Sequence, residues 1–422
     1  MKSYRQRLLK RLARDTLGLV MAGGRGTRLG ALTSHRVKPA VPFGGKYRLI
    51  DFTLSNCINS GIRRIGVLTQ YKSHSLIRHI QSGWSFLHGE FGEYIELLPA
   101  QQRIGSSWYQ GTADAVYQNK DIIMAQAPKW VLVLGGDHVY KMDYSDLLKY
   151  HVVSGAEITV GCVDVPVEQA SQFGVVEADS TGRVTAFKEK PAVVQENPGH
   201  PGYVFASMGI YVFNKDYLLQ TLAEDAEDEH SAHDFGNNIL PKALAKGDRL
   251  YGFLFRDIEG NHRGYWRDIG NLDAYWQANL ELIGVTPALD LYDNEWPIWT
   301  YQLQAPPCKF VLDEEGRRGM AVDSMLAGGC IVSGAHVRRS MLFPFVRIEE
   351  GTIIEDSIIL SNAIIGKHCS IHRAVIETGC EIPDGSIIGE NLEADRLQYE
   401  VSLGGITLVT PEMLNQKLSY VR

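Results

Sequence analysis

The stretch LGLVMAGGRGTRL, residues 17–29, decides the fold of the first half of the chain. Its apolar run from Leu17 to Ala22 is uninterrupted, which is typical of a strand buried on both faces of a parallel sheet. The glycines that follow allow backbone N–H groups to approach phosphate oxygens, and the start of a helix beyond them adds a favourable dipole. The stretch therefore predicts a buried strand that leads into a phosphate-binding loop.

This loop carries positive charges that a purely structural turn does not need. Arg25 and Arg28 lie within it, and Lys38 follows in the segment KPA. No Gly-Lys-Ser/Thr follows the glycines, so the loop is not a Walker loop, and Leu29 stands where a dinucleotide-binding fingerprint has its third glycine. Three cations around one loop suit a triphosphate or a departing pyrophosphate better than the single bridge of a dinucleotide.

Further along the chain, apolar runs at residues 65–69 and 131–134 alternate with helical patterns at 113–125 and 144–151. This alternation predicts right-handed βαβ units and therefore an α/β domain with a mostly parallel sheet. The next part is richer in strands. Its expected elements are strands at 158–163, 184–188 and 210–213, a solvated acidic loop at 224–229 and a helix at 272–282.

The pattern changes near the end of the chain, where aliphatic residues recur every five or six positions from Ile331 to Ile388. A parallel β-helix gives such a repeat, because each short strand buries one aliphatic residue before a turn. We expect a left-handed parallel β-helix of about three coils, with a meander of chance spacing as the alternative. The end coils of such a solenoid leave apolar surface that must be covered, so we expect packing against the first domain or another subunit.

The chain has 422 residues, which is long for a single hydrophobic core. Four prolines between residues 286 and 325 indicate a connection that crosses the surface. The expected division is a basic N-terminal tail at 1–15, a nucleotidyltransferase catalytic domain at 16–285, an inter-domain connection at 286–325 and a β-helix domain for oligomerisation and regulation at 326–422.

Composition excludes several classes of protein. Hydrophobic residues make up 45% and charged residues 22%, which rules out a disordered or collagen-like chain. The net charge of −7 argues against a nucleic-acid partner, and no apolar run approaches the ~20 residues that cross a membrane.

The 6 cysteines form no CxxC pair, so we expect reduced thiols in a cytoplasmic protein. Residues 1–14 are basic without any acid, and we expect a solvated tail or helix there, with anion sensing as a hypothesis.

Two aspartates are candidates for a divalent metal. Asp137 follows the apolar run at 131–134, at the sheet edge where α/β folds place ligand sites. Asp268, in YWRD, again follows a strand pattern. Mg²⁺ prefers a few carboxylates together with phosphate oxygens and water, so both aspartates could serve one ion. Alternatively, either could cap a helix or a turn.

Together with several longer motifs, the glycine-rich loop and KPA resemble the signature of the sugar-nucleotide pyrophosphorylases. Within that family the chain is most similar to the bacterial ADP-glucose pyrophosphorylases, the glucose-1-phosphate adenylyltransferases of glycogen synthesis. The resemblance runs in the same order from about residue 16 to about residue 415. The motifs are FGGKYRLIDF (43–52), SNCINSGI (55–62), WYQGTADA (108–115), GGDHVYKMDY (135–144), SMGIYVF (207–213) and YWRDIG (265–270).

The resemblance implies a Rossmann-like, glycosyltransferase-A-like domain that uses Mg²⁺ to transfer an adenylyl group from ATP to glucose 1-phosphate. The attacking phosphate is already an anion near pH 7, so alignment and charge neutralisation suffice without a general base. The residues implied are Arg25, Arg28, Lys38 and Asp137 for catalysis, Asp137 and Asp268 for Mg²⁺, Tyr109, Gly174, Glu189, Lys190, Ser207 and Trp266 for the sugar phosphate, and Gly23, Gly24, Gln70, Gln101 and Gly111 for the nucleotide.

The same resemblance implies regulation by phosphorylated metabolites and a homotetramer built partly through the β-helix. Arg36, Arg48 and Arg373 match basic positions of an effector site where the two domains meet. His35 stands where enterobacterial relatives carry an activator-contacting lysine, and Pro42 where they carry a histidine. The missing fixed charge leaves fructose 1,6-bisphosphate, fructose 6-phosphate and pyruvate open as activators.

Three other functions stay open from the sequence. Enzymes that use UTP or dTTP share the glycine-rich loop but usually lack SNCINSGI and WYQGTADA. A non-catalytic regulatory homologue tends to lose the loop arginine or the metal aspartate, and both types of residue are present here. An acyltransferase would use a histidine of the β-helix, for which His336, His368 and His372 are available, but it leaves the N-terminal motifs unexplained.

Overall fold

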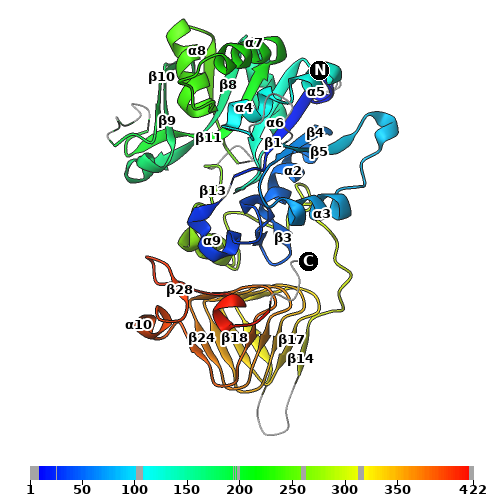
Figure 1. Ribbon diagram of the computed structural model, residues 1–422, viewed down its shortest axis with the longest axis vertical. Helices are drawn as coiled ribbons and strands as arrows, with labels where there is room; N and C mark the ends of the chain where they lie inside the picture. Colours follow the sequence, from blue (N-terminus) through cyan, green and yellow to red (C-terminus); the bar gives the residue numbers. More distant parts are fainter. Residues whose placement is uncertain are drawn as a thin grey trace.

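The computed structural model describes residues 9–24, 26–100, 108–192, 194, 196, 200–257, 263–311 and 318–417. It consists of an α/β domain and a β-helix, and helix α9 (Leu272–Glu281) lies between them (Figure 1). Two expected site residues, Arg25 and Gln101, and the first eight residues of the basic tail lie outside the described residues. No helix of the described ranges is long and apolar enough to cross a membrane.

The α/β domain is built on one sheet of nine strands. At its centre, β1 (Thr16–Met21) pairs in parallel with β4 (Arg64–Thr69) on one side and β6 (Trp130–Gly135) on the other, which confirms the three predicted buried strands. The long strand β11 (Tyr203–Asn214) is antiparallel to β6 and begins the second half of the sheet. The other strands are β5 (Tyr94–Pro99), β8 (Ile158–Pro166), β9 (Gly174–Ala178), β10 (Val184–Glu189) and β12 (Leu250–Leu254).

Helices cover both faces of this sheet, and each face has its own hydrophobic core. In β1, Val20 belongs to one core and Leu17 and Leu19 to the other, as expected for a strand buried on both sides. The helices are α2 (Leu49–Asn59), α3 (His74–Gly83) and α6 (Tyr144–Val153) on the first core, and α4 (Thr112–Tyr117), α5 (Lys120–Gln126), α7 (Lys215–Ala226) and α8 (Leu240–Lys246) on the second.

Two local predictions differ from the structure. The expected helix at 113–125 is two short helices, α4 and α5, separated at residues 118–119. The acidic run at 224–229 is not simply a solvated loop, because α7 extends to Ala226 and Asp225 is buried. Asp225 receives hydrogen bonds from Lys242 and His233. These two partners lie 8 and 17 residues further along the chain and offset the cost of burying this carboxylate. The composition of the acidic run alone could not reveal them.

The C-terminal domain is the predicted parallel β-helix, with three sheets that form its sides. Two of the sheets contain five strands each, more than the expected three coils. The first coil lies inside the stretch assigned to the connection, because β14 and β15 pair in parallel with β17 and β18. The strands are β14 (Lys309–Val311), β15 (Met320–Val322), β16 (Met325–Leu326), β17 (Ile331–Ser333), β18 (His336–Arg338), β19 (Met341–Leu342), β20 (Arg347–Ile348), β21 (Ile353–Glu355), β22 (Ile358–Ile359), β23 (Ile364–Ile365), β24 (Ser370–His372), β25 (Ala374–Ile376), β26 (Glu381–Ile382), β27 (Ile387–Ile388), β28 (Glu400–Val401) and β29 (Thr407–Val409).

The two domains share a hydrophobic core, as the need to cover the solenoid predicted. Leu272 and Tyr275 of α9 belong to the same buried cluster as Phe343, Leu360 and Leu408 of the β-helix domain. The arrangement places α9 and the short elements after the glycine-rich loop directly against the β-helix (Figure 1).

Candidate active site

The glycine-rich loop leaves β1 and turns at Gly26 into a short 3₁₀ helix, η1 (Thr27–Thr33). Gly26 has a φ of 64°, and a Cβ there would lie 2.9 Å from the Cβ of Lys38. Both the left-handed backbone and the close approach require glycine. The Thr33 hydroxyl lies 3.0 Å from the carbonyl oxygen of Gly26 and 3.1 Å from that of Gly30, which fastens the loop beside Lys38 in η2 (Lys38–Ala40).

Lys38 joins the two aspartates that the sequence proposed as metal ligands. Its Nζ donates to Oδ1 of Asp268 at 2.6 Å and lies 2.9 Å from Oδ2 of Asp137. Asp137 follows β6, while Asp268 ends β13 (Trp266–Asp268), which is antiparallel to β7 (His138–Tyr140) with Asp268 opposite His138. The β13–β7 pairing thus brings together groups from distant parts of the chain, a convergence that sequence alone could not show.

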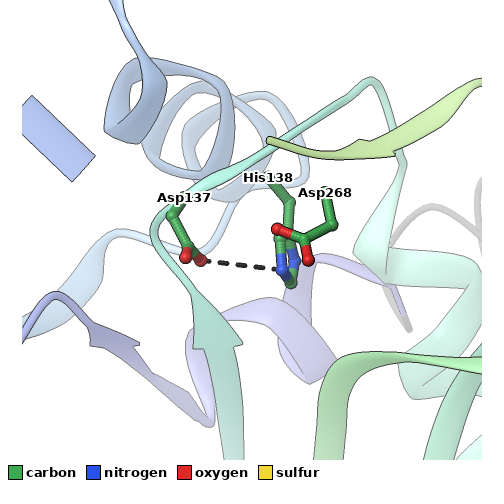
Figure 2. Close-up of side chains that lie close together, drawn as sticks. All are labelled: Asp137, His138 and Asp268. Carbon is green, nitrogen blue, oxygen red and sulfur yellow. Dashed lines mark ion pairs between the residues drawn. The ribbon is translucent and has the colours of Figure 1, made fainter. Parts of the chain in front are cut away.

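His138 is a third metal-compatible side chain that the sequence reasoning missed. Figure 2 shows Asp137 and His138 on consecutive positions and Asp268 facing them, and one ligand atom of each lies within 4.8 Å of the others. His138 Nε2 is 3.6 Å from Oδ1 of Asp137, and its Nδ1 is buried without a hydrogen-bond partner among the described residues. Carboxylate and imidazole donors fit a divalent cation. Lys38, Asp137, His138 and Asp268 are called the catalytic cluster below.

Opposite charges shift the pKa values inside the catalytic cluster. Burial alone would lower the pKa of Lys38, but the charges of Asp137 and Asp268 outweigh it and raise this pKa. Burial alone would raise the pKa of Asp137, but Lys38 and His138 reverse this and hold it at about 2. Lys38 and Asp137 are therefore both ionised at neutral pH. Two carboxylates face one ammonium group, which leaves excess negative charge for a cation to neutralise.

Several residues proposed for the nucleotide gather beside the loop. A Cβ at Gly23 would lie 3.3 Å from the Cβ of Gln70, which follows β4. Gln70 Nε2 donates to the backbone oxygen of Tyr109 at 3.3 Å, so these three predicted residues are neighbours. Around Gly24 a Cβ would meet no atom within 4 Å, which leaves this backbone open to a ligand.

Arg28 and Gly111 are placed by different contacts. A Cβ at Gly270 would lie 3.6 Å from Nη1 of Arg28 and 3.5 Å from Oδ2 of Asp268, which puts the Arg28 guanidinium beside the catalytic cluster. Gly111 precedes α4, and a Cβ there would lie 2.2 Å from the backbone oxygen of His233. Backbone packing therefore explains this glycine without any nucleotide contact.

The residues proposed for the sugar phosphate lie along β9, β10 and β11. Lys190 follows β10 with a left-handed φ of 45°, and its Nζ donates to Oε1 of Glu189 at 2.9 Å. Such a backbone is uncommon for a non-glycine residue and is found at functional sites. A Cβ at Gly174 would lie 2.9 Å from Oε2 of Glu189, so the glycine makes room for this carboxylate. Ser207 lies at a bulge of β11 and accepts a hydrogen bond from the Gly209 backbone N–H at 3.3 Å.

Trp266 links this group to the catalytic cluster. Its ring meets His138 and Phe173 edge to face, with 5.2 Å between ring centroids in each pair. Phe173 immediately precedes Gly174. On the other side, a Cβ at Gly209 would lie 3.6 Å from Cε1 of His138. The proposed sugar residues and the proposed metal residues are therefore parts of one site.

Asp234 and Tyr211 are two more polar residues of this site that the sequence reasoning missed. A Cβ at Gly236 would lie 3.0 Å from Oε2 of Glu189 and 3.4 Å from Oδ1 of Asp234. Both carboxylates therefore lie next to Gly236. Burial raises the pKa of Tyr211, and the negative charges of Asp234 and Glu189 raise it as well. A hydrogen bond with the Ser207 hydroxyl lowers this pKa. Tyr211 lies inside the motif SMGIYVF, and this position in a family motif is the sequence feature that could have identified it as a site residue.

A second site lies between the α/β domain and the β-helix, where a cavity of about 840 Å³ is lined by the predicted effector residues His35, Arg36 and Arg48. Arg36 Nη1 donates to both carboxylate oxygens of Glu377, at 3.1 and 3.0 Å. His35 Nε2 lies 2.7 Å from Oε1 of Glu412. We call this the inter-domain cavity.

The inter-domain cavity also contains basic residues that were not predicted, Lys46 and Arg78. The pKa of Arg48 is lowered to about 10, chiefly by burial. The positive charges of Arg36 and Arg78 lower it further, while the negative charge of Asp51 raises it. Arginines that repel one another favour an anion between them. The prediction for Arg373 finds no support here, because Arg373 is not among the lining residues.

The guanidinium of Arg373 lies outside the lining of the inter-domain cavity. It stacks over the ring of Trp276, 4.9 Å from the centroid, and donates to the backbone oxygen of Gly404 at 3.0 Å. Its contacts connect α9 with the end of the β-helix domain.

Comparisons with known proteins agree with both halves of the structure. A nucleotidyl transferase family model matches residues 17–284, and a model described as GlmU-like, C-terminal hexapeptide matches residues 306–409. The chain is 56% identical over 421 residues to the glucose-1-phosphate adenylyltransferase of Nitrosococcus oceani, covering 100% of both chains. It is 56% identical over 416 residues to that of Methylococcus capsulatus, covering 99% of this chain and 98% of the relative. It is 57% identical over 415 residues to glucose-1-phosphate adenylyltransferase 2 of Alkalilimnicola ehrlichii, covering 98% of both. The chain belongs to the glucose-1-phosphate adenylyltransferase family of nucleotidyltransferases.

Proposed function

We propose that this protein transfers the adenylyl group of ATP to glucose 1-phosphate, which forms ADP-glucose, the glucosyl donor for glycogen, and releases pyrophosphate. The observation that carries the proposal is the convergence of Lys38, Asp137 and Asp268 beside the glycine-rich loop. The family to which the chain belongs supports the same reaction.

The reaction replaces one phosphoanhydride linkage with another. A phosphate oxygen of glucose 1-phosphate attacks the α-phosphorus of ATP, a P–O bond forms, and the bond to pyrophosphate breaks. Backbone N–H groups at Gly23 and Gly24 and the cations Arg28 and Lys38 hold the triphosphate and stabilise the charge on the departing pyrophosphate. Arg25 has the same role by its place in the loop.

The acidic residues of the catalytic cluster hold the divalent cation that the family uses. Asp137 and Asp268 supply the carboxylates, and His138 contributes a third donor or orients Asp137. A Mg²⁺ ion held by these residues would neutralise charge on the reacting phosphates. Lys38 would pair with phosphate oxygens in place of its carboxylate partners, since an ammonium group pairs with either.

The sugar phosphate binds on the side of β10 and β11. Lys190 supplies a point charge for the phosphate. Glu189 and Asp234 accept hydrogen bonds from the sugar hydroxyl groups, and Ser207 accepts or donates one. Trp266 borders the sugar with its ring. The strained backbone of Lys190 fixes the direction of its side chain.

The test is pyrophosphate release by the purified full chain with Mg²⁺ and glucose 1-phosphate, supplied in turn with ATP, UTP and dTTP. Release with ATP alone supports the proposal. Preference for UTP or dTTP would assign a different nucleotide, and no release with any of them would favour a non-catalytic homologue. Omission of glucose 1-phosphate is the control for simple hydrolysis of ATP.

We further propose that the inter-domain cavity binds anionic effectors. Arg36, Arg48 and Arg78 surround it, and their excess positive charge suits the phosphate of a sugar phosphate. The Arg36–Glu377 pair spans the two domains, so an anion that replaces Glu377 as partner of Arg36 changes the contact between them. Titration of ADP-glucose formation with fructose 1,6-bisphosphate, fructose 6-phosphate and pyruvate identifies the effector.

We also propose that the protein is a homotetramer. Ile353, Ile364 and Ile387 of the β-helix are exposed, with 44%, 41% and 61% of their surfaces accessible. Ile353 and Ile387 lie on one sheet of the β-helix and Ile364 lies on another, and exposed apolar side chains of this kind favour self-association. Sedimentation equilibrium of the full chain measures the mass directly, and a monomer at micromolar concentration would contradict this proposal.

A further inference from the structure

The end of the β-helix domain turns back toward the α/β domain (Figure 1). After helix α10 (Leu392–Asp395), strand β28 is antiparallel to β29, and β29 is parallel to β25 of the β-helix. We call residues 400–409 the C-terminal hairpin. Its base is part of a β-helix sheet, so the hairpin is held by a rigid body rather than by a free tail.

One contact of the C-terminal hairpin reaches the helix that follows the glycine-rich loop. The backbone N–H of Ala31 in η1 donates to Oε2 of Glu400 at 3.0 Å. The preceding residue, Gly30, has φ 58° and ψ −138° and interrupts the helical backbone of η1. A Cβ at Gly30 would lie 1.8 Å from Oε1 of Glu400, so only glycine allows the carboxylate to come this close.

A second contact reaches α9 on the other side. The Ser402 hydroxyl donates to Oδ1 of Asp273, and the Gly404 backbone N–H donates to Oδ2 at 3.2 Å. A Cβ at Gly404 would lie 2.5 Å from the same carboxylate, which again shows close packing. Arg373 donates to the Gly404 carbonyl oxygen at 3.0 Å and holds the turn of the hairpin.

Both contacted segments carry residues of the catalytic site. Ala31 lies three positions after Arg28 on η1, and Asp273 lies five positions after Asp268. The C-terminal hairpin therefore contacts both the short helix that carries Arg28 and the helix that follows Asp268. Misplacement of a binding group by about 1 Å costs up to about 100-fold in rate, so such a span matters for catalysis.

We propose that Glu400 of the β-helix domain is a positioning residue for the nucleotide-binding loop. It acts through Ala31 and Gly30, and the Asp273 contact fixes the opposite side. This inference rests on the proposed function for its kinetic readout. It makes the β-helix a part of the active-site framework, in addition to its proposed roles in assembly and effector binding.

The test compares Glu400→Ala and Glu400→Gln in the full chain. Glu400→Ala raises the KM for ATP by about 10-fold and lowers kcat, while the KM for glucose 1-phosphate changes by less than about 2-fold. Glu400→Gln recovers most of the wild-type values, because its amide oxygen still accepts from Ala31 N–H. Hydrogen–deuterium exchange of residues 27–33 becomes faster in Glu400→Ala only, a readout that does not depend on activity.

The matched control is Glu393→Ala, which should leave all values unchanged. Glu393 is an exposed glutamate of α10, and its side chain forms no hydrogen bond within the described part of the chain. Equal changes in both KM values, or exchange in residues 27–33 that stays at the wild-type rate, would overturn the proposal. A wild-type chain that forms no ADP-glucose would instead reject the proposed function, and the exchange experiment would still decide the role of Glu400.

Discussion

The catalytic cluster and the inter-domain cavity lie on either side of one short segment, and their charges are opposite. Lys38 pairs with Asp137 and Asp268, so two carboxylates share one ammonium group. Two residues earlier, Arg36 pairs with Glu377 in a cavity that Arg48 and Arg78 also line. The catalytic cluster has two carboxylates for one ammonium group, with Arg28 beside it, whereas four basic side chains of the inter-domain cavity face two acidic ones: Arg36, Lys46, Arg48 and Arg78 against Glu377 and Glu412.

This difference teaches what each site can bind. A buried or half-buried charge without full compensation is costly, and a ligand of opposite charge removes the cost. The catalytic cluster therefore suits a divalent cation, and the inter-domain cavity suits a phosphate group. Residues 36 and 38 lie on one short segment, and we propose that an effector response reaches the catalytic cluster through this segment.

The largest expected effect concerns the catalytic cluster. Asp137→Asn should lower kcat roughly 1000-fold, because one carboxylate that holds the cation is lost. Mn²⁺ binding, followed by electron paramagnetic resonance, should weaken in parallel while circular dichroism stays unchanged. Asp293→Asn is the matched control, since it also removes the partner of a lysine, Lys141 at 3.0 Å, but outside the site. Near-wild-type turnover of Asp137→Asn would show that this aspartate is not a metal ligand.

A smaller effect is expected on the sugar side. Lys190→Ala should raise the KM for glucose 1-phosphate by about 30-fold, the value of one charge-assisted hydrogen bond, and leave the KM for ATP nearly unchanged. Steady-state kinetics with each substrate varied in turn measures this split. Lys188→Ala, which removes an exposed partner of Glu177, is the control on the same strand. If both KM values rise equally, Lys190 does not contact the sugar phosphate.

The smallest effect concerns the inter-domain cavity. Glu377→Gln should strengthen binding of a phosphorylated effector by about 10-fold, because the carboxylate that competes for Arg36 is gone. It should also lower the melting temperature, and the effector should restore it. Glu412→Gln, which breaks the exposed pair with His35, should change both quantities less. Effector affinity that falls in Glu377→Gln would mean that Glu377 is itself a ligand.

Much of the fold could be predicted from sequence because its signals are local. The apolar run before Gly23 marks β1, and the aliphatic repeat from Ile331 to Ile388 marks the β-helix. The first coil was missed because four prolines between residues 286 and 325 indicated a connection, and the aliphatic repeat was recognised only from Ile331 onward.

The site was harder to predict, since its geometry depends on pairing between distant segments. Asp137 and Asp268 could each be named as candidate metal ligands from the sequence. Only the pairing of β13 with β7 shows that both lie next to Lys38. His138 was overlooked because a histidine next to an aspartate carries no pattern of its own. Glu400 had no signal either, because its partner is a backbone N–H more than 300 residues away.

The most direct test of the account compares ADP-glucose formation by wild type, Asp137→Asn and Arg78→Gln at saturating substrates, with and without the three candidate effectors. Arg78 lines the inter-domain cavity but has no contact with the catalytic cluster. The account predicts that Asp137→Asn loses turnover under all conditions, whereas Arg78→Gln keeps the basal rate and loses the effector response. Wild-type turnover in Asp137→Asn, or an unchanged effector response in Arg78→Gln, would contradict the assignment of opposite ions to the two sites.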